Sequence, residues 1–175
     1  GDLYASKNKF LLALKNYQKY FEISKRVYGE EPNPNLGHAY HSLGWLYLKF
    51  DQYLLALDNF KKGLDIEMKI SGRYGPQTGV IYFYIAWAFH ALKKYPQARE
   101  YYTESVIANT KATKELRVCD SFFNMSIIFK EFGDDVNALD FKKKSIMIYN
   151  KVHGKNHQMS HNAAQNMAVI DEEKD

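Results

Sequence analysis

The sequence predicts an all-α protein, a right-handed superhelical solenoid of antiparallel helix hairpins. Two observations carry the prediction. First, the chain repeats itself with a period near 42 residues. A small residue and an alanine twelve positions later recur as Gly1 and Ala13, Gly44 and Ala56, Ala86 and Ala98, and Ser126 and Ala138. Second, the apolar residues within each copy follow the three-and-four spacing of a helix, as in the stripe Tyr40, Leu43, Gly44 and Tyr47.

The repeats form one array over residues 1–175. A partial repeat, 1–35, begins with the remnant of a first helix, and its second helix contains Phe10 to Leu14. The ranges of the three full repeats and of the start of a further repeat are 36–78, 79–117, 118–157 and 158–175. Because Gly1 aligns with the middle of a first helix and the last helix lacks its partner, we expect the chain to be a piece of a longer protein.

Each full repeat is predicted to fold as two helices joined by a short polar link. The small residues of the stripes let the two backbones approach closely, which favours an antiparallel hairpin. Links such as 50–52 and 93–95 join the two helices of a copy, and Gly29 and Gly72 are suited to end the second helices. The link at 112–115 contains neither Gly nor Pro, so there we expect the second helix to run on or to turn without a strong stop.

The composition is that of a folded protein without disulfides. Of 175 residues, 46% are hydrophobic and 25% are charged, while ten Gly and four Pro are too few for many short strands. Cys119 is the single cysteine, so no internal disulfide can form, and we expect a cytoplasmic location. No apolar run approaches the ~20 residues that span a bilayer. A net charge of +4 is too mild to indicate nucleic acid, so we expect neither membrane nor nucleic-acid binding.

The motif resembles the tetratricopeptide repeat over almost the whole chain. The small positions of that family are filled by Gly44, Ala86 and Ser126, the aromatic position by Tyr47, Phe89 and Phe129, and the second-helix alanine by Ala56, Ala98 and Ala138. The ordinary repeat of the family has 34 residues. The longer period is similar to that of kinesin light chains and of related scaffold and bacterial regulator proteins. The resemblance implies a solenoid whose first helices line an inner, concave wall.

The inner-wall residues are predicted from the face opposite the core stripe of each first helix. They form a candidate peptide-binding groove of His38, His41, Ser42, Trp45, Lys49, Phe83, Tyr84, Trp87, His90, Phe123, Asn124, Ile127 and Lys130. Trp45 and Trp87 lie 42 residues apart and therefore on adjacent helices, about 10 Å from each other. Aromatic rings beside a few donors suit the capture of a peptide. The alternative is that the long helices bury both tryptophans as core.

Weaker signals add little to this site. His38, His41 and His90 would make binding depend on pH between roughly 5.5 and 7 if they are solvent-accessible. His157 and His161 could form a metal pair, but Gly154 separates them from His153, and we predict no metal site and no cofactor. The chain has no phosphate loop, zinc-type cysteine pairs or serine elbow. We therefore predict that it is not an enzyme.

The leading functional prediction is a non-catalytic adaptor that binds a peptide segment of a partner protein. The net positive charge is compatible with an acidic partner. One alternative is a regulatory or sensor array of a larger signalling protein, such as a bacterial regulator or an ATPase switch, that holds an intramolecular segment or a peptide signal. Another is homotypic assembly through the open ends, which no feature of the sequence indicates.

Overall fold

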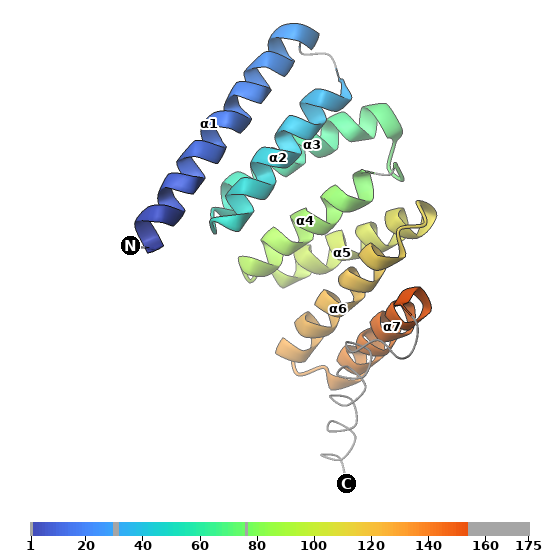
Figure 1. The fold of residues 1–175 in the computed structure, drawn as a ribbon. Helices are drawn as coiled ribbons and strands as arrows, with labels where there is room; N and C mark the ends of the chain where they lie inside the picture. The colour runs from blue at the N-terminus through green and yellow to red at the C-terminus, as the bar shows by residue number, and fades with distance from the viewer. Residues whose placement is uncertain (1, 30–31, 76, 154–175) are drawn as a thin grey trace.

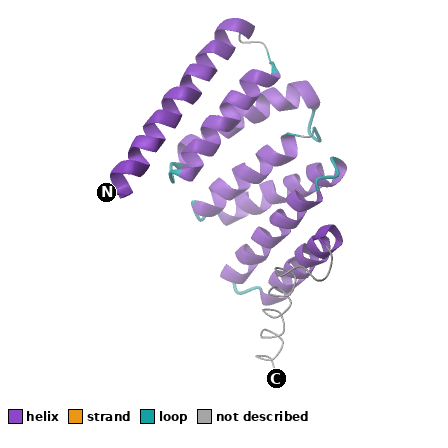
Figure 2. Cartoon of the chain, in the orientation of Figure 1, coloured by secondary structure: helices purple, strands orange, loops and turns teal. Residues whose placement is uncertain are grey.

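The computed structural model describes residues 2–29, 32–75 and 77–153. Within them the chain forms seven helices and no strand. Figure 2 shows these helices joined by loops. The helices are α1 (Asp2–Tyr28), α2 (Pro34–Lys49), α3 (Tyr53–Ser71), α4 (Thr78–Ala91), α5 (Tyr95–Lys111), α6 (Glu115–Glu131) and α7 (Asp135–His153). The prediction of an all-α fold is confirmed.

The helices pair into hairpins that stack along one direction (Figure 1). α2 packs with α3, α4 with α5 and α6 with α7, while α1 packs on α2, α4 on α3 and α6 on α5. α2 also touches α4, and α4 touches α6, so these three helices follow one another in one layer. We call the exposed face that they turn away from α3, α5 and α7 the first-helix wall. The stacking is that of a helical solenoid.

The two helices of each hairpin are joined by a tight turn with one residue in the left-handed region. Asp51, Lys93 and Gly133 occupy the same repeat position and have φ values of 58°, 57° and 72°. Only glycine adopts this conformation without steric cost. The backbone N–H groups next to these residues bond to the last carbonyls of the first helix, for example Gln52 N to Tyr47 O at 2.9 Å. The turn geometry therefore repeats although the residue does not.

At the link between α5 and α6, where we expected the helix to run on or to turn without a strong stop, the chain turns. α5 ends at Lys111, and Thr113 takes a positive φ of 56°. Lys114 N donates to Asn109 O at 2.8 Å, which satisfies one of the carbonyls left free at the helix end. A hydrogen-bonded turn thus ends the helix where the sequence offers neither Gly nor Pro.

α1 is one continuous helix, whereas the sequence predicted the remnant of a first helix followed by a second helix. Asn8 takes the repeat position of Asp51 and Lys93, where a turn was expected. Instead it lies inside α1. The helix continues through this position, where each added residue makes a further backbone hydrogen bond.

Small residues mark the contacts between paired helices. Ala56, Ala86 and Ala98 are fully buried. A Cβ atom added to Gly44 would lie 2.7 Å from the ring of Phe60, which is itself fully buried. Gly44 is therefore required by the close approach of the Phe60 ring to α2, as the repeat pattern predicted.

Each hairpin also has a crossing point, which we define as the pair of residues 26 positions apart where its two helices touch. The three pairs are Gly37 with Gly63, Gly79 with Ser105, and Cys119 with Ser145. A Cβ atom added to Gly63 would lie 3.5 Å from the carbonyl oxygen of Gly37. Small side chains at these points set the distance between the helices.

None of the helices in the described part of the chain combines the length and the apolarity needed to cross a bilayer.

Candidate functional site

Two tryptophans stand on the first-helix wall at equivalent places. Trp45 on α2 is 37% exposed and Trp87 on α4 is 39% exposed, while the residues on either side of each are buried. The ammonium group of Lys49 lies 5.3 Å from the Trp45 ring centre, and the Tyr84 ring centre lies 6.3 Å from that of Trp87. The alternative in which both indoles are buried core therefore does not describe this structure.

Tyr84 is the residue that joins the wall across three repeats. Its ring stacks on Phe60 of α3 at 5.6 Å and contacts the imidazole of His41 on α2 at 5.4 Å. Arg117 of α6 lies over the same ring, with its guanidinium carbon 5.5 Å from the ring centre. The Nη2 atom of Arg117 also donates to the Tyr84 hydroxyl at 3.4 Å. The aromatic wall is thus held from both neighbouring hairpins.

Arg117 belongs to the wall but was not predicted to do so. Its equivalents in the two preceding repeats are Asn35 and Gln77. In each repeat this position comes one helical turn before the first predicted wall position, which is His38, Val80 or Asp120. Extending the predicted wall by one helical turn would have found it. Its side chain is about one-third exposed and also lies within ion-pair distance of Asp120, at 3.5 Å. It adds a cation to the wall beside Tyr84.

Phe83 was predicted to line the groove, and that prediction is wrong. Its side chain is only 6% exposed. It packs edge-on against Tyr102 of α5 at 5.7 Å, and the Arg117 guanidinium covers its other side at 5.2 Å. Its helix position borders the core stripe, and the next hairpin closes over it, so Phe83 is part of the core.

His41 does not provide the pH dependence expected between 5.5 and 7. Burial is the main reason why the pKa of His41 falls to about 4, with smaller contributions from the charges of His38 and Arg117. Burial also lowers the pKa of His90, against an opposing effect of Glu131. His41 is therefore neutral throughout that range. The imidazole Nε2 of His41 is buried without a hydrogen-bond partner among the described residues.

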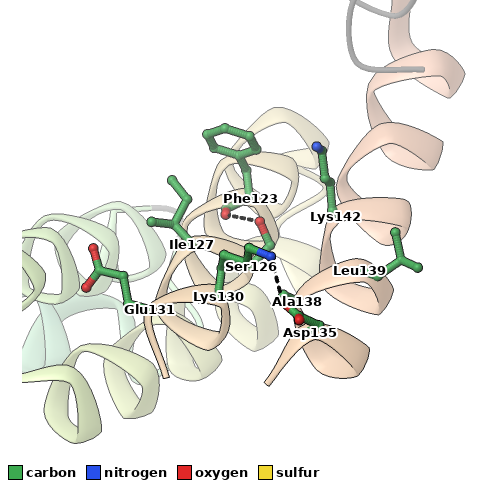
Figure 3. A pocket seen from close by; sticks show the side chains of 9 residues that line it. All are labelled: Phe123, Ser126, Ile127, Lys130, Glu131, Asp135, Ala138, Leu139 and Lys142. Carbon is green, nitrogen blue, oxygen red and sulfur yellow. Dashed lines mark hydrogen bonds and ion pairs between the residues drawn. The ribbon is translucent and has the colours of Figure 1, made fainter. Parts of the chain in front are cut away.

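Three of the predicted residues on α6, Phe123, Ile127 and Lys130, line a separate cavity between α6 and α7 (Figure 3). Its volume is about 280 Å³, and Phe123 and Ile127 form its apolar side together with Ala138 and Leu139 of α7. Lys130 closes one end through an ion pair with Asp135 at 2.7 Å. Phe123 is 48% exposed, although its repeat equivalent, Phe83, is buried under α6. This difference reflects the absence of a further described helix over α6.

The remaining predicted residues border the wall. His38 and Lys49 are exposed, Ser42 is half-buried, and the amide of Asn124 donates to the carbonyl of Asp120 at 2.9 Å. Among residues 2–29, 32–75 and 77–153, no three His, Cys, Asp or Glu side chains are placed to bind a metal. The histidine pair at 157 and 161 and the further repeat at 158–175 lie outside the described residues.

The chain is similar to proteins of one family. The model of the tetratricopeptide repeat matches residues 1–69 and 51–106. No curated protein matches the chain in sequence.

Three solved structures share the fold. BtubC (BKLC) from P. vanneervenii is 18% identical with a TM-score of 0.81, over 97% of this chain and 68% of that one. The TPR-like repeats of a protein assigned as a kinesin light chain from Podosopora anserina are 16% identical with a TM-score of 0.74, over 93% and 77%. The apo form of RapI is 16% identical with a TM-score of 0.75, over 98% and 61%. At these identities the similarity establishes the solenoid fold.

Proposed function

Because this chain belongs to the tetratricopeptide repeat family, we propose that it is a non-catalytic module that captures a peptide segment of a partner protein on its first-helix wall. One observation carries the proposal: Trp45 and Trp87 occupy equivalent places on α2 and α4, and each remains more than a third exposed. Apolar side chains gathered on a surface and bordered by polar groups often mark an interaction site. We propose that the module acts as an adaptor in the cytoplasm.

The proposed binding surface has three aromatic side chains at its centre. Trp45, Tyr84 and Trp87 offer large faces to apolar side chains of the peptide, and residues of this kind supply most of the energy at protein interfaces. Tyr84 is fixed by Phe60, His41 and Arg117. A fixed ring loses little conformational freedom when a ligand binds, which favours affinity. An extended peptide, or one face of a helix, fits such a surface.

The polar border of this surface carries both signs of charge. Lys49 and Arg117 are cationic, while Asp120 and Glu131 are anionic. The surface therefore does not select peptides by net charge. We propose that it recognises apolar or aromatic side chains, with an acidic group of the peptide placed beside Lys49 or Arg117 by a charge-assisted hydrogen bond.

Selection from a random peptide library tests the proposal, followed by titration of the selected peptide against single variants. Trp45→Ala and Trp87→Ala are expected to weaken binding at least about 10-fold, because each removes an aromatic anchor. Leu54→Ala is the matched control: Leu54 is exposed but lies on α3, outside the wall. Circular dichroism establishes that each variant is folded. Selected peptides that bind both tryptophan variants as tightly as the wild type would refute the site.

As a second proposal, the chain is a regulatory or sensor array of a larger signalling protein. Sequence that flanks the chain would distinguish this proposal from the adaptor. A DNA-binding, nucleotide-binding or protease module beside the array favours regulation, and a coiled coil favours the adaptor.

A further inference from the structure

α1 has an exposed apolar stripe that no described residue covers. It consists of Leu12, Tyr20, Ile23 and Val27 together with the polar residue Asn16, and these five follow the three-and-four spacing of one helix face. Leu12 and Val27 are 63% and 61% exposed, and Tyr20 and Ile23 are also exposed. α1 contacts α2 through a different face, on which Phe10 meets Phe50 at 4.6 Å and Phe21 meets Tyr40 at 5.0 Å. The stripe is therefore additional to the surface that joins α1 to the array.

The same face is covered by a helix in the next hairpin. Asn59, Gly63 and Ile66 of α3 stand at the repeat positions of Asn16, Tyr20 and Ile23. Gly63 packs against the backbone of Gly37 on α2, and the Ile66 side chain lies 3.4 Å from the Cβ position of Gly37. This face of a second helix is thus shaped to receive another helix along its length.

Tyr20 sets the α1 stripe apart from the other hairpins. At its repeat position the crossing points have small residues: Gly63, Ser105 and Ser145. The Ser105 hydroxyl bonds directly to the Gly79 carbonyl, which requires the two backbones to be close. A tyrosine at this point holds an incoming helix farther away, with side chains between the two backbones. The α1 face therefore suits a helix that approaches less closely than the helices within a hairpin.

The net positive charge of the chain lies on this helix. Residues 1–28 contain six Lys or Arg and two Asp or Glu, which leaves eighteen of each sign in the rest of the chain. Lys15, Lys19, Glu22 and Arg26 each precede a stripe residue by one position, so they lie on the solvent side of the stripe, about 100° around the helix. All four are exposed. This side of the stripe has three basic residues and one acidic residue, and we call it the basic border.

We propose that the α1 stripe docks an acidic amphipathic helix of a partner protein. Its apolar face would cover Leu12, Tyr20, Ile23 and Val27, and its carboxylates would face the basic border. Charge complementarity of this kind speeds association and selects the partner. A helix is favoured over a membrane surface because the equivalent faces of α3, α5 and α7 each receive a helix. This surface is distinct from the first-helix wall.

The test uses the full chain and two labelled synthetic helices of about 20 residues. Both have leucines on one face, and the polar face carries glutamates in the first and lysines in the second. Fluorescence anisotropy is expected to show binding of the glutamate helix, weakened at least about 10-fold by Ile23→Asp and by the triple change Lys15→Glu, Lys19→Glu and Arg26→Glu. The lysine helix is expected to bind at least about 10-fold more weakly than the glutamate helix.

Matched controls locate the effect. Val136→Asp changes an exposed apolar residue on α7, and Lys143→Glu reverses an exposed charge there; neither is expected to affect binding. Trp45→Ala and Trp87→Ala are also expected to leave it unchanged, so this proposal and that for the wall can fail separately. The proposal is overturned if both helices bind equally or if Ile23→Asp has no effect. It is also overturned if wild-type α1 is occupied by a second copy in light scattering, or binds anionic lipid vesicles instead of the glutamate helix.

Discussion

Ser105 Oγ donates a 2.9 Å hydrogen bond to the carbonyl oxygen of Gly79, at the point where α5 crosses α4. The Asn109 amide donates to both the carbonyl and the hydroxyl oxygen of Ser105, each at 2.9 Å. Ser121 of α6 adds a contact at 3.2 Å, so three helices meet at one buried polar cluster. Buried polar groups of this kind are stable only when hydrogen-bonded. The cluster therefore fixes how the second and third full hairpins stack.

Gly79→Ala is expected to destabilise the protein by about 1 to 2 kcal/mol, measured by urea unfolding. The added Cβ would lie 2.8 Å from Asn109, which is fully buried and held by Ser105. Gly37→Ala is the matched control at the same repeat position. Its Cβ would meet the Glu67 carboxylate at 3.3 Å, and that flexible side chain can move. Because alanine also favours the helix by about 1 kcal/mol, Gly37→Ala is expected to be neutral or stabilising. Equal losses in both variants would contradict this account.

Trp45→Ala and Trp87→Ala are each expected to lower the free energy of unfolding by about 2 kcal/mol, less than for a fully buried ring, since 37% and 39% of their surfaces already face water. Phe60→Ala is expected to cost about 3 to 5 kcal/mol because the Phe60 ring is fully buried. Thermal and urea unfolding of the three variants provide the comparison. A loss at either tryptophan as large as that at Phe60 would mean that the indole supports the fold.

Stability is expected to fall as the pH is lowered from about 6.5 to 4. The ordinary histidine pKa is 6.5, and burial lowers that of His41 to about 4 in the folded state. In that interval the unfolded chain binds a proton that folded His41 does not, so acid favours unfolding. The full effect is on the order of 3 kcal/mol. In urea unfolding across this range, the free energy of unfolding should change less with pH for His41→Phe, which keeps the ring contacts with Phe60 and Tyr84, than for the wild type. If both proteins show the same change, His41 is not the source of the pH dependence.

Cys119 is expected to resist alkylation in the folded protein. Its thiol is buried, and burial raises its pKa despite a hydrogen bond to Ser145 that acts in the opposite direction. Both conditions keep the reactive thiolate rare. Iodoacetamide labelling at about pH 8 should be slow in buffer and fast in urea. Rapid labelling of the native protein would show that α6 and α7 separate readily. Because Cys119 is the single cysteine, no other thiol contributes to the signal.

Repeat spacing predicted much of the architecture because a helix fixes which residues share a face. The small residues at 44, 56, 86 and 98 were recognised from their twelve-residue spacing, and all four lie in tight helix contacts. At the turns, the residue types were less informative about where a helix ends. Thr113 adopts a positive φ that its own side chain disfavours, because hydrogen bonds to the end of α5 hold it there. The residue types around Asn8 likewise did not reveal that α1 continues through the expected turn.

The sequence alone determined the repeat, the helical fold and the exposed sides of α2 and α4, because these follow from periodicity within one helix. It could not determine which wall residues a neighbouring hairpin covers. Phe83 and Phe123 occupy one repeat position, yet Arg117 covers only Phe83. His41 is half-buried against rings from α3 and α4. Tertiary structure decided these cases, since burial depends on side chains that reach across from residues distant in the chain.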